Sequence, residues 1–140
     1  MILYLDTSAL VKLYVQELGS DAVRSSVLGA DVTATSIMSY AEARATFARL
    51  RREQRVNDDA LALLKNQLLE DWPRYLVVAT DESLIRRAGD LAEAFALRGY
   101  DSVQLAAAEY VRMHSDTPVT FACFDQRLSH AASVLGMGAL

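Results

Sequence analysis

The chain has 140 residues, the usual size of a single domain, and 52% of them are apolar. Glycine and proline are few, so the composition suits a packed core and argues against disorder. The net charge of −4 argues against a protein that coats nucleic acid generally, although a local basic patch could still contact phosphates.

Short apolar runs and longer helical patterns alternate along the chain. Four runs rich in β-branched and aromatic residues predict strands at 2–5, 32–35, 75–79 and 119–124. The patterns between them predict seven helices, which begin near Thr7, Ser20, Ser36 or Ser39, Asn57 or Asp58, Thr80 or Asp81, Asp101 and Asp125. They end near Gln16, Gly29, Arg55, Pro73, Gly99, Pro118 and Gly136.

This alternation predicts an α/β fold with one domain spanning residues 1–140. We expect a three-layer α/β/α sandwich whose central sheet is mainly parallel and has four or five strands. The tail at 136–140 either adds a small edge strand or frays, and the sequence leaves both alternatives open.

Targeting signals and disulfides are the next features to examine. No apolar run approaches the roughly 18 residues that a bilayer span requires, so we expect no membrane partner. Residues 1–5 are apolar, but no basic segment precedes them and Asp6 follows at once, which argues against a secretory signal. The single Cys123 cannot form an internal disulfide. These features together predict a reduced, cytoplasmic setting.

Four acidic residues lie at the ends of predicted elements. In open parallel sheets, ligands bind beyond the carboxyl ends of the strands, so residues that directly follow strands are the most informative. Asp6 follows the first strand and Asp125 follows the fourth. Glu42 lies near the start of the third helix, and Asp101 opens the sixth. A fold of this kind could bring these four acids together.

Each acid also has a simpler structural interpretation. Asp6, Asp101 and Asp125 are placed to cap helices, and Ser39 with Glu42 fits the S-x-x-E capping box. Asp81 also follows a strand, and we interpret it as a plain cap. Because caps are common, only the joint pattern of the four acids favours a functional site.

The chemistry of such a cluster would require a counter-charge, because neighbouring carboxylates cannot all stay ionised on their own. Oxygen ligands suit Mg²⁺ or Mn²⁺, whereas Cys123, His114 and His130 lack the spacing of a zinc site. An ion of this kind can orient and acidify a water for attack on a phosphodiester. Ser8 could hydrogen-bond a carboxylate or a metal-bound water, and an ordinary role in the first helical turn is the alternative.

The segments around these acids resemble the PIN-domain family, and within it the VapC toxins of type II toxin–antitoxin pairs. The segments are YLDTSALVKLY, SYAEARATF, DWPRYLVV, LRGYDSVQLAAA and VTFACFDQRLSHAA, and they cover nearly the whole chain in the right order. The resemblance implies an endoribonuclease that depends on Mg²⁺ or Mn²⁺. It also implies an RNA substrate, a homodimer, and a cognate antitoxin that can insert a basic side chain into the acidic site.

The resemblance also assigns roles to individual residues. Asp6, Glu42 and Asp101 match the three core acids of the family, and Asp125 matches a fourth, more variable one. Ser8 matches a hydroxyl position beside the first acid, and Thr7 is its neighbour. Close relatives often have a histidine where this chain has Gln104, which could hydrogen-bond in the site but cannot transfer a proton as histidine could. Because all four acids are present, we expect activity.

Basic and aromatic residues offer further candidates. The third helix and its end carry several arginines, which we interpret mainly as a solvated face: Arg44, Arg49, Arg51, Arg52 and Arg55. Arg44 is the best candidate for RNA contact because it lies two residues from Glu42. Lys12, Arg86 and Arg87 are interpreted as solvated charges. Tyr14, Tyr40 and Tyr100 could stack on RNA bases, with core packing as the simpler interpretation.

Two other functions compete with the nuclease. A Mg²⁺-dependent phosphotransfer domain is disfavoured by spacing, because Asp6 has no acidic neighbour, no lysine follows the fourth strand, and Ser8 stands where a phosphatase of the haloacid dehalogenase type needs a second aspartate. The other alternative is a PIN-fold RNA-binding or interaction module with little or no nuclease activity.

Overall fold

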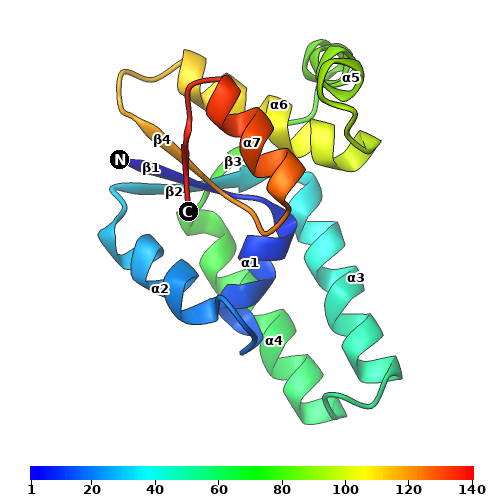
Figure 1. Cartoon of the computed structure of the whole chain (residues 1–140). Coiled ribbons are helices and arrows are strands. Elements are labelled where there is room, and N and C mark those ends of the chain that lie inside the picture. Colours follow the sequence, from blue (N-terminus) through cyan, green and yellow to red (C-terminus); the bar gives the residue numbers. More distant parts are fainter.

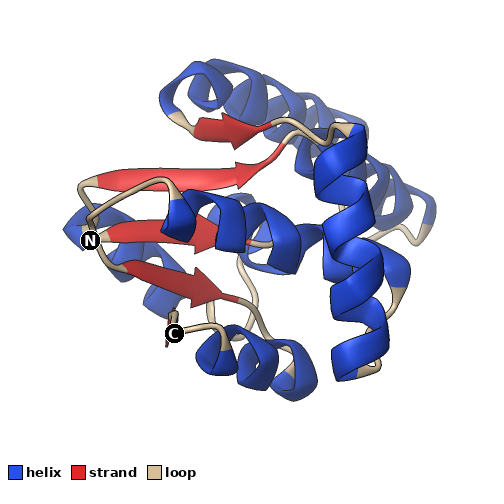
Figure 2. Cartoon of the chain, turned by 90° about the horizontal axis from the view of Figure 1, so that it is seen from above, coloured by secondary structure: helices blue, strands red, loops and turns tan.

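A parallel sheet with the strand order β3-β2-β1-β4-β5 forms the centre of the computed structural model, which describes residues 1–140. The strands are β1 (Ile2–Leu5), β2 (Val32–Ser36), β3 (Leu76–Val78), β4 (Val119–Ala122) and β5 (Gly138–Ala139). Every pairing is parallel, so the strand arrows point the same way in Figure 2. The tail therefore adds an edge strand, and Gly138 pairs with Thr120 of β4.

Helices cover both faces of the sheet and complete a three-layer α/β/α sandwich, as predicted. They are α1 (Thr7–Tyr14), α2 (Ser20–Gly29), α3 (Met38–Arg52), α4 (Asp58–Asp71), α5 (Glu82–Phe95), α6 (Gly99–Met113) and α7 (Gln126–Val134), with a short 3₁₀ turn η1 (Trp72–Arg74) after α4. One layer holds α5, α6 and α7, and the other holds α1 to α4 (Figure 1). None of these helices combines the length and the apolar character that a bilayer crossing requires.

The central strand β1 is buried on both faces, which explains its continuous apolar sequence. Because side chains alternate along a strand, Ile2 and Tyr4 pack beneath α5, α6 and α7, whereas Leu3 and Leu5 pack beneath the opposite layer. The ring of Tyr4 stacks on Phe121 of β4 with 5.5 Å between the ring centroids. This double burial fixes the end of β1, where Asp6 lies.

The turn between α5 and α6 differs from the prediction that Gly99 ends the fifth helix. Helix α5 ends earlier, because Ala96 takes a left-handed conformation with φ of 53°. Gly99 instead begins α6, and Asp101 therefore lies inside its first turn and does not cap the helix. The interpretation of Asp101 as a cap is wrong, since no side chain caps α6.

The start of α3 also differs from the prediction. The helix begins at Met38, whose N–H is accepted by Ser36 Oγ, so Ser39 already lies within the first turn. No capping box forms between Ser39 and Glu42, and both side chains are free to make tertiary contacts. The helix ends at Arg52, earlier than predicted, because Gln54 adopts a positive φ of 59°.

Candidate functional site

The candidate site lies at the carboxyl ends of β1 and β4. The strand order reverses between these two strands, because β2 and β3 lie to one side of β1 and β4 and β5 to the other. Such a reversal separates the following connections and leaves a crevice at the end of the sheet. Asp6 follows β1 and Asp125 lies three residues after the end of β4, so both are placed at this crevice.

A cavity of about 370 Å³ opens at this point and is lined by all four predicted acids. Thr7, Ser8 and Gln104 line it as well. The elements that supply the acids are the starts of α1, α3, α6 and α7, and the acids themselves are Asp6, Glu42, Asp101 and Asp125. The expectation that the fold brings these acids together is confirmed by their shared cavity.

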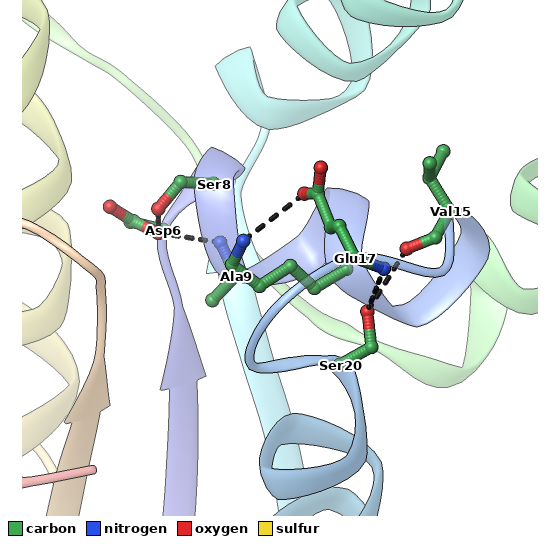
Figure 3. Close-up of polar contacts among 7 residues, drawn as sticks. Asp6, Ser8, Ala9, Val15, Glu17 and Ser20 are labelled. Atoms are coloured by element: carbon green, nitrogen blue, oxygen red, sulfur yellow. Dashed lines mark hydrogen bonds and ion pairs between the residues drawn. The ribbon is translucent and has the colours of Figure 1, made fainter. Parts of the chain in front are cut away.

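Asp6 is both a helix cap and a member of the cavity wall. Its Oδ1 accepts the N–H of Ala9 at 2.8 Å and the hydroxyl of Ser8 at 2.7 Å, as Figure 3 shows. The residue is only 6% exposed. The capping and functional interpretations are therefore compatible, because a single carboxylate oxygen makes both of these hydrogen bonds.

Burial also changes the proton affinity of Asp6. Desolvation raises the pKa of this carboxyl to about 6, the hydrogen bonds from Ala9 and Ser8 oppose the rise, and the negative charges of Asp101 and Glu42 add to it. No side-chain cation bonds to Asp6 to compensate its charge. A bound cation would therefore lower the pKa of Asp6 again.

Glu42 is held by a buried network beneath the cavity. Its Oε1 accepts the hydroxyl of Thr7 at 2.8 Å and the side-chain amide of Gln104 at 3.1 Å. Gln104 is 2% exposed, and its Oε1 accepts the hydroxyl of Tyr4 at 2.8 Å. The prediction that Gln104 faces the site and hydrogen-bonds there is confirmed by this geometry.

Asp101 and Asp125 complete the acidic wall. Asp101 Oδ2 accepts the guanidinium Nε of Arg98 at 3.1 Å. Asp125 Oδ1 accepts the N–H of Leu128 at 2.9 Å and so caps α7, as predicted. Asp125 is exposed, whereas Asp101 is half-buried.

The four carboxylates share one property that matters for ligand binding. Each uses a single oxygen in the hydrogen bonds above, and the other oxygen has no hydrogen-bond partner in the chain. Carboxylate oxygens are the ligands that Mg²⁺ and Mn²⁺ prefer. No three acidic side chains are arranged closely enough in this structure to hold a metal ion together. The donor set thus fits a hard cation, which would have to draw the acids closer together.

The arginines that line the cavity do not include Arg44, which the sequence analysis named as the best candidate for RNA contact. Arg44 lies beside Tyr40, whose hydroxyl accepts its Nη1 at 3.2 Å, and it does not line the cavity. Two residues correspond to about 200° of helical rotation, so Arg44 points away from the face of Glu42. Arg49, seven residues after Glu42, shares that face and lines the cavity together with Arg55 and Arg98.

Some residues at the cavity were missed by the sequence analysis. Glu17 lines the cavity and binds Lys12 Nζ at 3.1 Å, so the interpretation of Lys12 as a solvated charge is wrong: its side chain is 13% exposed. Glu17 lies in the loop before α2, and no motif marks it. Phe124 also lines the cavity, and its position directly before Asp125 could have indicated this.

The chain is similar to known proteins both in sequence and in fold. A family profile described as PIN domain matches residues 3–133. The chain is 33% identical over 135 residues to Ribonuclease VapC49 of Mycobacterium tuberculosis, covering 96% of this chain and 92% of that protein. Among solved structures, it is similar to FitAB bound to an IR36 DNA fragment, with a TM-score of 0.72, 17% identity and coverage of 100% and 94%. A toxin-antitoxin complex from Klebsiella pneumoniae matches with a TM-score of 0.63, 12% identity and coverage of 88% and 86%.

Proposed function

Because this chain belongs to the PIN-domain family, we propose that it is an endoribonuclease that depends on a divalent metal ion and acts as the toxin of a toxin–antitoxin pair. The similarity to a protein named Ribonuclease VapC49 supports the RNA substrate and the hydrolytic reaction. The observation that carries the proposal is the cavity where four carboxylates meet, each with one oxygen free of hydrogen bonds.

Asp6, Glu42, Asp101 and Asp125 are the residues that would hold Mg²⁺ or Mn²⁺. When bound, the ion supplies positive charge that activates a water molecule and stabilises the charge developing on the attacked phosphate. The chain contributes the fixed positions of its acids. Ser8 donates to Asp6, and Thr7 and Gln104 donate to Glu42, so each of these acids presents its remaining oxygen in a defined direction.

The positive charges on the cavity wall suit a phosphate backbone. Arg49, Arg55 and Arg98 line the same cavity as the acids, although the whole chain is negatively charged. They would attract RNA and offset the repulsion between its phosphates and the carboxylates. Arg44 is not at the cavity, so we propose that these three arginines contact the RNA in its place.

The test compares cleavage of a structured RNA by the purified chain and by two variants, with Mg²⁺ or Mn²⁺ and no protein partner. Asp6→Asn and Asp101→Asn should each lower the rate by at least about 100-fold, because changes merely beside a metal ligand already cost about 10- to 100-fold. Gel electrophoresis of the labelled RNA measures the rate. Equal cleavage by parent and variants would refute the site.

Asp81→Asn is the matched control. Asp81 caps α5 with the same geometry with which Asp6 caps α1, since its Oδ1 accepts the N–H of Leu84 at 2.9 Å. It does not line the acidic cavity, so this variant should cleave RNA at the parental rate. RNA binding without cleavage in either metal would instead favour the alternative of a PIN-fold RNA-binding module.

We extend the proposal to the protein partners. A toxin of this kind would form a homodimer and bind an antitoxin, and the toxin-antitoxin complex from Klebsiella pneumoniae with the same fold supports the second partner. Helix α4 uses Leu64 and Leu68 in the core and leaves Leu63 and Leu69 exposed for contacts of this type. Light scattering measures whether the chain forms a dimer.

A short reading frame just upstream that encodes a small DNA-binding protein would support the antitoxin. A cytoplasmic site of action fits both the RNA substrate and the unpaired Cys123.

A further inference from the structure

Two exposed aromatic rings stand beside the acids, and each directly precedes one of them in the sequence. Tyr100 comes before Asp101 and Phe124 before Asp125. Both rings line the acidic cavity, and they are 46% and 48% exposed. Large aromatic side chains are usually more buried than this, so the exposure at a cavity indicates a binding role for the rings.

The ring of Phe124 is held in place by its neighbours. Lys12 Nζ lies 4.5 Å from the ring centroid, and Glu17 binds the same ammonium group at 3.1 Å. Gly19 has a φ of 93°, and a Cβ atom at this residue would lie 2.6 Å from Phe124 Cε1. Bare backbone and a fixed cation therefore support the ring, while about half of the residue stays open to solvent.

Tyr100 has a comparable cationic partner. The guanidinium carbon of Arg98 lies 5.0 Å from the Tyr100 ring centroid, and Arg98 Nε also donates to Asp101. One arginine thus links the ring to the carboxylate next to it. The other two tyrosines that the sequence suggested as platforms are engaged elsewhere: Tyr14 donates to Asp71, and Tyr40 packs against Trp72.

We propose that Tyr100 and Phe124 are stacking platforms for unpaired RNA bases next to the phosphate that is cleaved at the acidic cavity. This inference rests on the proposed ribonuclease function. Aromatic rings bind bases of any sequence through their faces, and Arg98 beside Tyr100 could contact a neighbouring phosphate. A continuous duplex hides its base faces within the stack, so the platforms select RNA that is unpaired at the cleavage point.

The experiment measures binding of an RNA of about 12 nucleotides labelled with 2-aminopurine, in EDTA, so that no cleavage is needed. Fluorescence anisotropy gives the dissociation constant, and quenching of 2-aminopurine reports stacking. Tyr100→Ala and Phe124→Ala should each weaken binding of the single strand by about 5- to 100-fold and reduce the quenching. Tyr100→Phe and Phe124→Tyr keep the rings and should retain both signals.

Tyr110→Ala is the matched control. Tyr110 lies on the same helix α6 as Tyr100 and is 51% exposed, but it does not line the acidic cavity. Its removal should leave single-strand binding unchanged. Thermal unfolding checks that every variant is folded, and Phe124→Leu replaces Phe124→Ala if the latter does not fold, because leucine still packs against Gly19 but offers no ring face.

Three outcomes would overturn the inference. The alanine variants could bind the single strand as tightly as the parent, or could weaken single-stranded and fully paired RNA equally. They could also bind RNA normally while losing a protein partner, which would assign the rings to a protein interface. Cleavage by the parent in Mg²⁺ is measured separately, so a failure of the ribonuclease proposal is distinguishable from a failure of the platforms.

Discussion

The side-chain amide of Gln104 donates to Glu42 Oε1 at 3.1 Å and thereby joins the protein core to the acidic cavity. Gln104 itself accepts the hydroxyl of Tyr4, whose ring is fully buried against Phe121. The same amide lies 3.0 Å from Ser39 Oγ. Glu42 is therefore held through Gln104 by Tyr4 and Ser39, two buried residues that do not line the cavity.

Replacing Gln104 by leucine should destabilise the fold as well as the site. The variant leaves the hydroxyl of Tyr4 buried without its acceptor, and Glu42 loses a donor. We expect the free energy of unfolding to fall by about 1–3 kcal/mol, the usual cost of unsatisfied buried polar groups. Urea unfolding measures it, and Gln67→Leu on the exposed face of α4 is the control. Equal stability of the Gln104 variant and the parent would contradict the network.

Asp6 makes the stability of the metal-free protein depend on pH. The pKa of its carboxyl rises from 3.8 to about 6 on folding, mainly through burial. The folded protein keeps this proton at pH values where the unfolded chain has released it. The contribution of Asp6 to stability is thus fully present below the unfolded pKa and is lost as the pH rises through about 6, with a total near 3 kcal/mol.

Asp6→Asn removes this dependence, because asparagine is neutral and still caps a helix. In EDTA, we expect the variant to gain stability over the parent by about 2 kcal/mol as the pH goes from about 4.5 to about 8. Urea unfolding at several pH values measures the difference. A constant difference would show that the Asp6 carboxyl is not perturbed.

The elements that the sequence predicted well are those with strong local signals. The apolar runs before Asp6 and Asp125 marked β1 and β4, and the parallel order that follows from alternating strands and helices placed both acids at one edge. The turn at Ala96 could not be foreseen, because alanine rarely adopts a positive φ and Gly99 offered a more usual stop. Glu17 was missed because its place depends on how the loop after α1 folds back to Lys12.

Arg98 is the one side-chain cation paired with a site acid, and its removal should change metal binding. Its Nε donates to Asp101 Oδ2, and the pKa of Arg98 is raised mainly by this bond. A metal ion at Asp101 has to compete with that guanidinium. We expect Arg98→Gln to tighten Mn²⁺ binding, measured by calorimetry, by less than about tenfold, because the pair is exposed and screened by salt.

The size of the Arg98 effect should fall as salt is added, since the competing charge is screened. Arg74→Gln is the control, because Arg74 pairs with Asp71 at 3.6 Å outside the acidic cavity. Weaker Mn²⁺ binding by Arg98→Gln would show that the guanidinium helps to assemble the acids and does not compete with the ion.

Arg87 on α5 pairs with a buried carboxylate on the neighbouring helix α6. This pairing contradicts its interpretation as a solvated charge. Its Nε and Nη2 donate to the two carboxylate oxygens of Glu109 at 2.7 and 2.8 Å, and the Glu109 side chain is 8% exposed. Arg87→Ala would leave that carboxylate buried without a partner. If both groups were completely buried, the free energy of unfolding would fall by about 3–5 kcal/mol. Because Arg87 is half-exposed, we expect about 1–3 kcal/mol by urea unfolding.

The neighbouring Arg86 provides the control for this prediction. Arg86 pairs with Glu82 at 3.7 Å, and both side chains are largely exposed. Arg86→Ala should therefore change the free energy of unfolding by less than about 0.5 kcal/mol. Because Arg86 and Arg87 are adjacent on α5, the two variants have the same helix propensity change and the same change of net charge. A similar loss in both would assign the effect to the helix, and only a larger loss in Arg87→Ala supports the buried pair.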